Sequence, residues 1–480
     1  MSSQPPRKPH APQRADADAG VAPARRCAYT VLRRVFDDGA YADRAFAAAA
    51  AALNARDRAL AMRLAYGAVQ RVGTLDHLIG ALAERPAATL DAPLLAALRL
   101  GAYELLYTRG APHYAIVADA VQLAKAHARA GHGLVNAVLR RAIREGPDTL
   151  LAGLDDRTPE HAAVKHSHPL WLAQLWWQEL GADDARALMA ADNQPSEVAL
   201  RANTLVMDAP ALARQLPVRT HRDPAIAEAV VLEQPFDAHS SPLWQQGAFH
   251  AQSRAAMLVA HALDPRPGER VLDLCAAPGG KSTHIAALMH GHGEVLAVER
   301  NPARAARLAR TAQRLHAANV HVQIADAAAF PQGERSQAER PPGERPPRER
   351  PPAERPQAVG FDRVLVDPPC SGLGTLQARA DLRWRVTPQS LAELAGVQAR
   401  ILAAGARALR PGGVLVYSTC TISTIENERL IAAFLDSHPD FTLDGPGRLE
   451  AHGLHGSGAL LTLPHRHHTA GFFVARLRRS

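Results

Sequence analysis

Between residues 25 and 155, apolar side chains recur every three or four positions, which places them on one face of a series of helices. Segments with this pattern include RALAMRLAYGAVQR, PLLAALRLGAYELLY, AIVADAVQLAKA and GLVNAVLRRAIRE. Short Gly/Pro breaks separate several of them. The pattern predicts an all-helical bundle. Its last helix carries Arg140, Arg141 and Arg144, which would form either a solvated face or an RNA contact.

The pattern is less regular on both sides of this bundle. Residues 1–24 are rich in Pro, Arg and Ala without any period, and we expect a disordered tail. In residues 160–260, PLWLAQLWWQELG predicts an amphipathic helix, whereas VALRAN and AVVLE predict short strands. We expect a small α+β module there.

From residue 265 to 480, short β-rich apolar runs alternate with helical segments. The strand-like runs are RVLDL, EVLAVE, VHVQIAD, RVLVD and VLVYS. This alternation predicts an α/β fold with a doubly wound, mostly parallel, Rossmann-like sheet. A Pro-rich insert at 331–358 interrupts this alternation of strands and helices. It contains a repeated Glu-Arg-Pro-Pro sequence, which predicts an extended surface loop. The insert would be a neutral spacer or a nucleic-acid arm.

The composition adds limits on partners and location. The 480 residues carry a net charge of +8 and a pI near 9.7, which favours a polyanionic partner such as nucleic acid. Four scattered cysteines do not make a disulfide framework. The first residues lack the apolar core of a signal peptide, and no apolar run approaches 18 residues. We expect a cytoplasmic protein with no membrane contact.

Candidate chemistry lies where the expected strands end, because ligands of such sheets bind beyond the carboxyl ends of the strands. DLCAAPGGKST, residues 273–283, combines a glycine turn with a helix start, but it matches neither the dinucleotide fingerprint nor the phosphate loop. Glu299 follows at the end of the second strand and could bind ribose hydroxyls. Asp326 ends the third strand and could meet an adenine edge. Together they favour a nucleoside cofactor without a pyrophosphate, such as S-adenosylmethionine.

Three of the four cysteines also stand at strand ends. Cys370 follows Asp367 in DPPCSGLGTL, and Cys420 follows VLVYST; strands four and five should be neighbours, so both thiols could face one pocket. A thiolate that adds to carbon 6 of cytosine makes carbon 5 nucleophilic, and a carboxyl group such as Asp367 could stabilise the charge that develops. For Cys275, in contrast, we expect the ordinary role of a small buried hydrophobic residue. STIE at 423–426 has the form of a capping box that starts a helix.

These segments also carry a resemblance to known proteins. DLCAAPGGKS, DPPCSGLGTL and YSTCTISTIENE resemble the motifs of RNA cytosine-5 methyltransferases, and AIVADAVQLAK with GLVNAVLRR is similar to the NusB-like RNA-binding domain. The combination resembles the RsmB (Sun/Fmu) family over residues 25–480, apart from the insert. The resemblance implies an S-adenosylmethionine-dependent methyltransferase domain preceded by a NusB-like domain. It further implies methylation of carbon 5 of cytosine 967 in 16S ribosomal RNA, by a monomer without a metal.

The resemblance also implies roles for single residues. Cys420 would be the nucleophile, Cys370 would assist release of the product, and Asp367 would serve both catalysis and the cofactor. The implied cofactor contacts are Cys275, Ala276, Ala277, Pro278, Gly279, Gly280, Lys281, Glu299, Asp326 and Asp367. One departure is that Thr469 and Ala470 stand where the family usually has an acidic residue before GFF. The nearby His465, His467 and His468 would form a solvated loop or a metal site.

Two other functions fit parts of the sequence. Asp367-Pro-Pro resembles the turn of enzymes that methylate amino groups, but those enzymes need an aromatic residue where Cys370 stands. Alternatively, the chain could be an RNA-binding protein with a vestigial methyltransferase domain. An adduct with 5-fluorocytosine RNA would separate these readings, since only the thiol mechanism forms one.

Overall fold

The computed structural model describes residues 18, 20–330, 360–445 and 458–480. The insert expected at 331–358 and most of the tail expected at 1–24 lie outside the described residues. The chain forms two compact units. The first contains Met1–Asn193 together with Arg379–Trp384, and the second contains Gln194–Ala378 and Arg385–Ser480.

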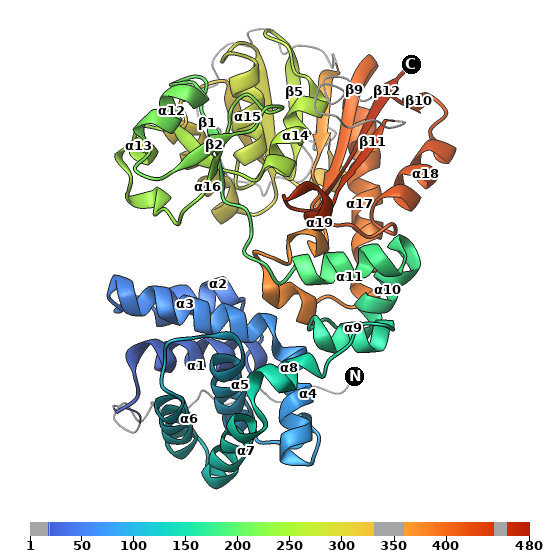
Figure 1. Cartoon of the computed structure of the whole chain (residues 1–480). Coiled ribbons are helices and arrows are strands. Elements are labelled where there is room, and N and C mark those ends of the chain that lie inside the picture. Colours follow the sequence, from blue (N-terminus) through green and yellow to red (C-terminus); the bar gives the residue numbers. More distant parts are fainter. Residues whose placement is uncertain (1–17, 19, 331–359, 446–457) are drawn as a thin grey trace, which may run out of the picture. The chain divides into compact units, whose positions relative to one another are not determined.

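The first unit is built from helices (Figure 1). They are α1 (Pro23–Phe36), α2 (Ala42–Ala49), α3 (Ala55–Gln70), α4 (Val72–Ala83), α5 (Ala92–Tyr107), α6 (His113–His127), α7 (His132–Glu145), α8 (Pro147–Ala152), α9 (Pro159–Lys165), α10 (Leu170–Leu180) and α11 (Ala182–Ala191). Helix α5 is buried along almost its whole length, from Leu94 to Leu106, because α1, α3, α4, α6, α7 and α8 pack around it. The helical N-terminal fold that the sequence predicted is confirmed.

A short segment from later in the chain completes the first unit. Residues Arg379–Trp384 follow the fourth strand of the large sheet in sequence, but they pack within the first unit. The guanidinium of Arg383 is fully buried and donates hydrogen bonds to the carbonyl of Ser167 and the side chain of Asn193, both at 3.0 Å. It also donates to the carbonyl of Asp192 at 3.1 Å. Three acceptors thus compensate for burying this charge.

The second unit begins with a small antiparallel sheet of order β2-β3-β1-β4. Its elements are β1 (Ala199–Ala202), α12 (Ala209–Gln215), β2 (Thr220–Arg222), β3 (Ala229–Leu232), α13 (Pro242–Gln245) and β4 (Phe249–Ala251). The runs VALRAN and AVVLE therefore form strands, as predicted from the sequence. The interval 160–260 was expected to be one module, but the structure divides it, because α9 to α11 pack in the first unit.

The rest of the second unit contains a large sheet of order β10-β12-β9-β8-β5-β6-β7, with β11 paired to β12. The elements are α14 (Arg254–Leu263), β5 (Arg270–Leu274), α15 (Gly280–Leu288), β6 (Glu294–Glu299), α16 (Pro302–Arg314), β7 (Val320–Ile324), β8 (Phe361–Val366), α17 (Pro388–Ala408), β9 (Leu409–Thr419), α18 (Glu428–Ser437), β10 (Phe441–Leu443), β11 (Ala459–Thr462), α19 (Pro464–His467) and β12 (Phe472–Arg479). Strands β5 to β9 pair in parallel, and β10 to β12 add an antiparallel edge. The predicted doubly wound, mostly parallel sheet is confirmed.

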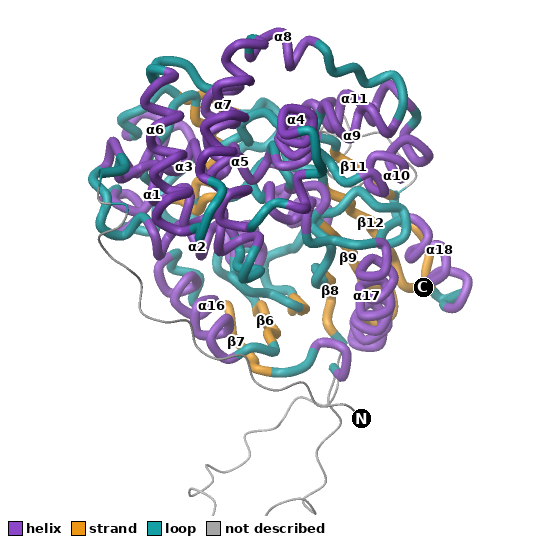
Figure 2. The backbone as a smooth tube through the Cα atoms, turned by 90° about the horizontal axis from the view of Figure 1, so that it is seen from below, coloured by secondary structure: helices purple, strands orange, loops and turns teal. Residues whose placement is uncertain are grey.

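Side-chain alternation along β9 divides the core into two layers. Val414 and Val416 pack with residues of α14 and α15 on one face of the sheet. Leu415 and Tyr417 pack with residues of α17 and α18 on the other face. Figure 2 shows α17 beside β8. Because helices cover both faces of the sheet, the sequences of the central strands are continuous apolar runs.

Helix α17 spans 21 residues but carries charged side chains along its exposed side, among them Glu393, Arg400 and Arg407. Within the described ranges, no helix combines the length and apolar character that crossing a membrane requires.

Candidate active site

The turn between β5 and α15 contains residues Cys275–Lys281. Its backbone reaches φ values of 67° at Cys275 and 101° at Gly279, and a Cβ on Gly279 would lie 2.8 Å from Cδ1 of Leu308. Only glycine fits that second position without strain. Gly279 is the N-cap of α15 and supplies no side-chain acceptor, so the helix start can bind a ligand. This turn therefore fits a cofactor that approaches the backbone closely.

A buried arginine from the small sheet supports this turn. Arg201 on β1 is fully buried and donates to the carbonyl of Gly280 and, at 3.0 Å, to the hydroxyl of Thr283. Burial lowers the pKa of Arg201 to about 9, which leaves it charged at neutral pH. Local pattern could not reveal this contact, because 79 residues separate Arg201 from Gly280.

The two thiols meet at the carboxyl ends of β8 and β9. The Sγ atoms of Cys370 and Cys420 lie 3.2 Å apart. The hydrogen bond with Cys420, together with burial, raises the pKa of Cys370 well above that of a free thiol. Cys275 packs against the apolar core of the sheet, and burial raises its pKa to about 12. Cys275 is therefore a neutral thiol at pH 7.

The carboxylate of Asp367 is held between two side chains. Its Oδ2 accepts from Lys281 Nζ at 2.7 Å, and its Oδ1 accepts from the Ser418 hydroxyl at 2.9 Å. Burial acts to lower the pKa of Lys281, but the Asp367 carboxylate more than offsets this and raises it. The ion pair of Lys281 and Asp367 thus stands beside the two thiols. Negative charge on Cys420 raises the pKa of Lys281 further.

The two other acids predicted for the site lie on neighbouring strands. Glu299 ends β6, is 4% exposed, and accepts from the backbone N–H of Asn301 at 2.8 Å. Arg304 forms an ion pair with it at 3.3 Å. Asp326 follows β7 and accepts from the N–H of Ala328 at 3.0 Å. In the sheet order, the turn after β5 lies between these acids and the pair of thiols.

The expectation for residues 423–426 was wrong. STIE forms no capping box: α18 begins at Glu428, and its N-cap Asn427 makes no side-chain cap. Glu426 is instead fully buried, and its carboxylate accepts from the N–H of Ser371 at 2.9 Å and from Gln398 at 2.8 Å. The hydroxyl of Ser371 donates to the same carboxylate at 2.5 Å. Donors from distant parts of the chain thus bind the Glu426 carboxylate in place of a local helix cap. Through Ser371, Glu426 connects the loop of Cys420 to the loop of Cys370.

Replacing Glu426 with alanine should lower the free energy of unfolding of the second unit by roughly 2–4 kcal/mol, because buried donors would lose their acceptor. Urea unfolding followed by circular dichroism measures this. Asp436→Ala provides the control, since Asp436 is an exposed acid on α18. Equal unfolding midpoints for both variants would contradict the structural role of Glu426.

Potential metal ligands gather elsewhere in the second unit. Among the described residues, the group with suitable geometry is Glu228, His261 and His284. Both imidazole Nε2 atoms contact the Glu228 carboxylate, at 2.7 and 2.6 Å. The nearby charge of Arg201 lowers the pKa of His284, after the larger effect of burial, and it would also oppose a bound cation. We therefore interpret this group as a buried hydrogen-bonded network.

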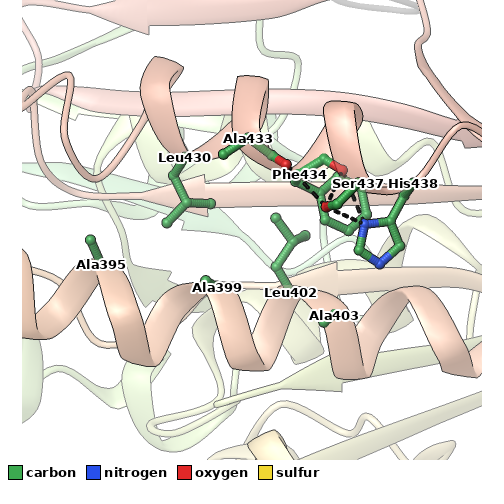
Figure 3. A pocket seen from close by; sticks show the side chains of 9 residues that line it. All are labelled: Ala395, Ala399, Leu402, Ala403, Leu430, Ala433, Phe434, Ser437 and His438. Atoms are coloured by element: carbon green, nitrogen blue, oxygen red, sulfur yellow. Dashed lines mark hydrogen bonds between the residues drawn. The ribbon is translucent and has the colours of Figure 1, made fainter.

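An apolar groove of about 380 Å³ lies between α17 and α18 (Figure 3). It is lined by Ala395, Ala399, Leu402, Ala403, Leu430, Ala433, Phe434, Ser437 and His438. None of the residues predicted for catalysis or cofactor binding belongs to this lining. The groove is thus separate from the candidate active site.

A mostly parallel sheet with a glycine turn after its first strand and a buried acid after its second is the architecture of S-adenosylmethionine-dependent methyltransferases. The family model described as 16S rRNA methyltransferase RsmB/F matches residues 260–478. The NusB family model matches residues 22–144, and a ferredoxin-like domain model of RsmF/B-like methyltransferases matches residues 168–239.

Whole-chain comparisons agree with these matches. The chain is 35% identical over 470 residues to a probable ribosomal RNA small subunit methyltransferase B of Synechocystis, covering 95% of this chain and 99% of the relative. It is 33% identical to the protein of that name in Bacillus subtilis, over 89% of this chain and 92% of the relative. A crystal structure of a methyltransferase homolog from Pyrococcus horikoshii superposes with a TM-score of 0.54 and 27% identity, covering 68% of this chain and 99% of that one.

The chain belongs to the RsmB family of methyltransferases. The family, the enzyme class and the cofactor S-adenosylmethionine, all predicted from the sequence, are confirmed. The residues present fit this cofactor: the turn 275–281 offers free backbone at a helix start, and Glu299 offers a buried carboxylate.

Proposed function

We propose that this enzyme methylates carbon 5 of a cytosine in 16S ribosomal RNA, cytosine 967 by family resemblance, through a covalent bond between Cys420 and carbon 6. The observation that carries the proposal is the 3.2 Å contact between the thiols of Cys370 and Cys420 beside a fixed carboxylate. The names of the relatives support a ribosomal RNA substrate. Methylation of an exocyclic amino group would not require paired thiols.

The mechanism assigns different tasks to the two thiols. The thiolate of Cys420 adds to carbon 6 of the ring, which makes carbon 5 an enamine-type nucleophile. Asp367, positioned by Lys281 and Ser418, acts in this step in its protonated form: its carboxyl group donates the proton to ring nitrogen 3 and so neutralises the negative charge that develops on addition. A neutral Cys370 can donate its S–H to the Cys420 thiolate before attack, which keeps that thiolate aimed at one position.

S-adenosylmethionine supplies the electrophilic methyl group when it is bound. The residues that would hold it are the turn 275–281, Glu299, Asp326 and Asp367. After methylation, a base removes the carbon-5 proton, the electron pair restores the ring double bond, and the Cys420 thiolate leaves. We assign assistance in this last stage to Cys370, because its sulfur lies beside the leaving thiol.

Bisulfite sequencing of 16S ribosomal RNA from cells with and without the gene tests the product. We expect one cytosine to read as protected only when the gene is present. If no protected cytosine disappeared when the gene was removed, the proposed reaction would be contradicted. Covalent trapping with 5-fluorocytosine RNA tests the thiol mechanism independently.

Replacing Glu299 with alanine should weaken S-adenosylmethionine binding about 10- to 150-fold, because the loss of a charged hydrogen bond to ribose hydroxyls costs about 1.5–3 kcal/mol. Isothermal titration calorimetry measures the change in affinity. Glu294→Ala, at the other end of β6, is the matched control. Unchanged affinity in the Glu299 variant would remove this carboxylate from the cofactor site.

A further inference from the structure

Helix α16 presents a row of arginines to solvent. Arg304, Arg307 and Arg310 are exposed and follow one another at intervals of three residues, so they share one side of the helix. The segment 300–325 contains five arginines and no Asp or Glu. We call Arg304, Arg307, Arg310 and Arg314 the α16 arginine face.

Most of this positive charge is not neutralised within the part of the chain that the structure describes. Arg304 pairs with Glu299, but neither Arg307 nor Arg310 forms an ion pair there. Like charges three positions apart on a helix repel one another, so the arrangement destabilises the free helix. A polyanion bound along the face would remove that repulsion.

An aromatic platform lies at the C-terminal end of the α16 arginine face. The guanidinium of Arg314 stacks 3.5 Å from the ring centroid of Trp244 and donates to the carbonyls of Trp244 and Phe249. His239 contacts the same indole at an angle, with ring centroids 4.6 Å apart and ring planes inclined by 55°. Flat arginine and aromatic groups of this kind stack on unpaired bases.

The N-terminal end of the α16 arginine face adjoins the candidate active site. Arg304 donates to the carbonyl of Ala277 at 3.1 Å, within the turn assigned to the cofactor. A helix of 13 residues is about 20 Å long. The face therefore extends away from the edge of the site over a distance that a strand of RNA could follow.

We propose that the α16 arginine face binds the sugar–phosphate backbone of the substrate RNA beside the target nucleotide, and that Arg314 with Trp244 receives an unpaired base. This inference rests on the proposed ribosomal RNA substrate. This regular spacing of arginines fits a chain of phosphates, because each exposed guanidinium can form paired hydrogen bonds with one phosphate group. An acidic protein partner would not use the Trp244 platform in this way.

The test compares two double variants of the full chain that change net charge equally. The first is Arg307→Glu with Arg310→Glu on α16. The control is Arg400→Glu with Arg407→Glu, which alters two exposed arginines on α17. Binding of transcribed 16S ribosomal RNA is measured by filter retention at several salt concentrations. Trp244→Ala is measured alongside, to probe the platform.

We expect the α16 variant to bind the RNA at least about tenfold more weakly and to lose roughly 1.4 from the slope of log affinity against log salt, about 0.7 for each lost phosphate contact. Its affinity for S-adenosylmethionine and its kcat at saturating RNA should not change. Equal losses in the α16 and α17 variants, or no loss in either, would overturn the proposed surface. If the unaltered enzyme bound no RNA, the proposed substrate itself would fail.

Discussion

Cys420→Ala is expected to reduce methyl transfer by roughly 10³-fold or more, because covalent catalysis loses its nucleophile while the other groups remain. The variant should still bind S-adenosylmethionine with nearly normal affinity, since Cys420 follows β9 whereas the cofactor turn follows β5. Incorporation of labelled methyl groups into 16S ribosomal RNA measures activity, and calorimetry measures cofactor binding.

Cys27→Ala is the control for this variant. Cys27 is a buried thiol of α1 in the first unit, so its loss should leave transfer intact. Substantial activity in Cys420→Ala would show that another group attacks the base. Loss of cofactor binding together with activity would instead indicate a damaged site.

The strands around the candidate site could be predicted closely because their signals are local. RVLDL became β5 and EVLAVE became β6, with the same first and last residues. Both are largely buried runs rich in Val, Leu and Ala that end at turns of the candidate site. The proximity of Cys370 and Cys420 also followed from sequence, since parallel strands four and five of such sheets are neighbours.

Contacts between distant parts of the chain could not be predicted in the same way. Arg201 and Glu426 are both fully buried, and each is satisfied by partners from other segments of the sequence. In a linear sequence, Glu426 has the form of a helix cap, and only the fold brings Ser371 and Gln398 to its carboxylate. A charged residue within an otherwise apolar strand, as Arg201 is, was the available signal for a buried tertiary contact.

The division of residues 160–260 has a similar cause. Helices α9 to α11 have ordinary amphipathic patterns, and pattern alone does not say which unit covers their apolar sides. In the structure, Arg383 binds Ser167 and Asn193 and so helps to hold this region within the first unit. That arginine lies some 190 residues after its acceptor on Asn193.

Cys370→Ala is expected to give the opposite kinetic result from Cys420→Ala. The two sulfurs lie 3.2 Å apart, so their positions alone would allow either to attack the base. The proposed chemistry separates them. Addition requires a single thiolate, Cys420, whereas completion requires loss of the carbon-5 proton and departure of that thiolate. Without Cys370, addition and methylation should proceed, but release should be slow.

The Cys370→Ala enzyme should therefore accumulate a covalent complex with unmodified 16S ribosomal RNA, visible as a slowly migrating band on a denaturing gel. Cys420→Ala and the double variant should form no such band, because nothing attacks carbon 6. If the band appeared in Cys420→Ala and not in Cys370→Ala, the two roles would be exchanged. If neither single variant formed it, Cys370 would have no role in release, and its contact with Cys420 would serve only to orient the attacking sulfur.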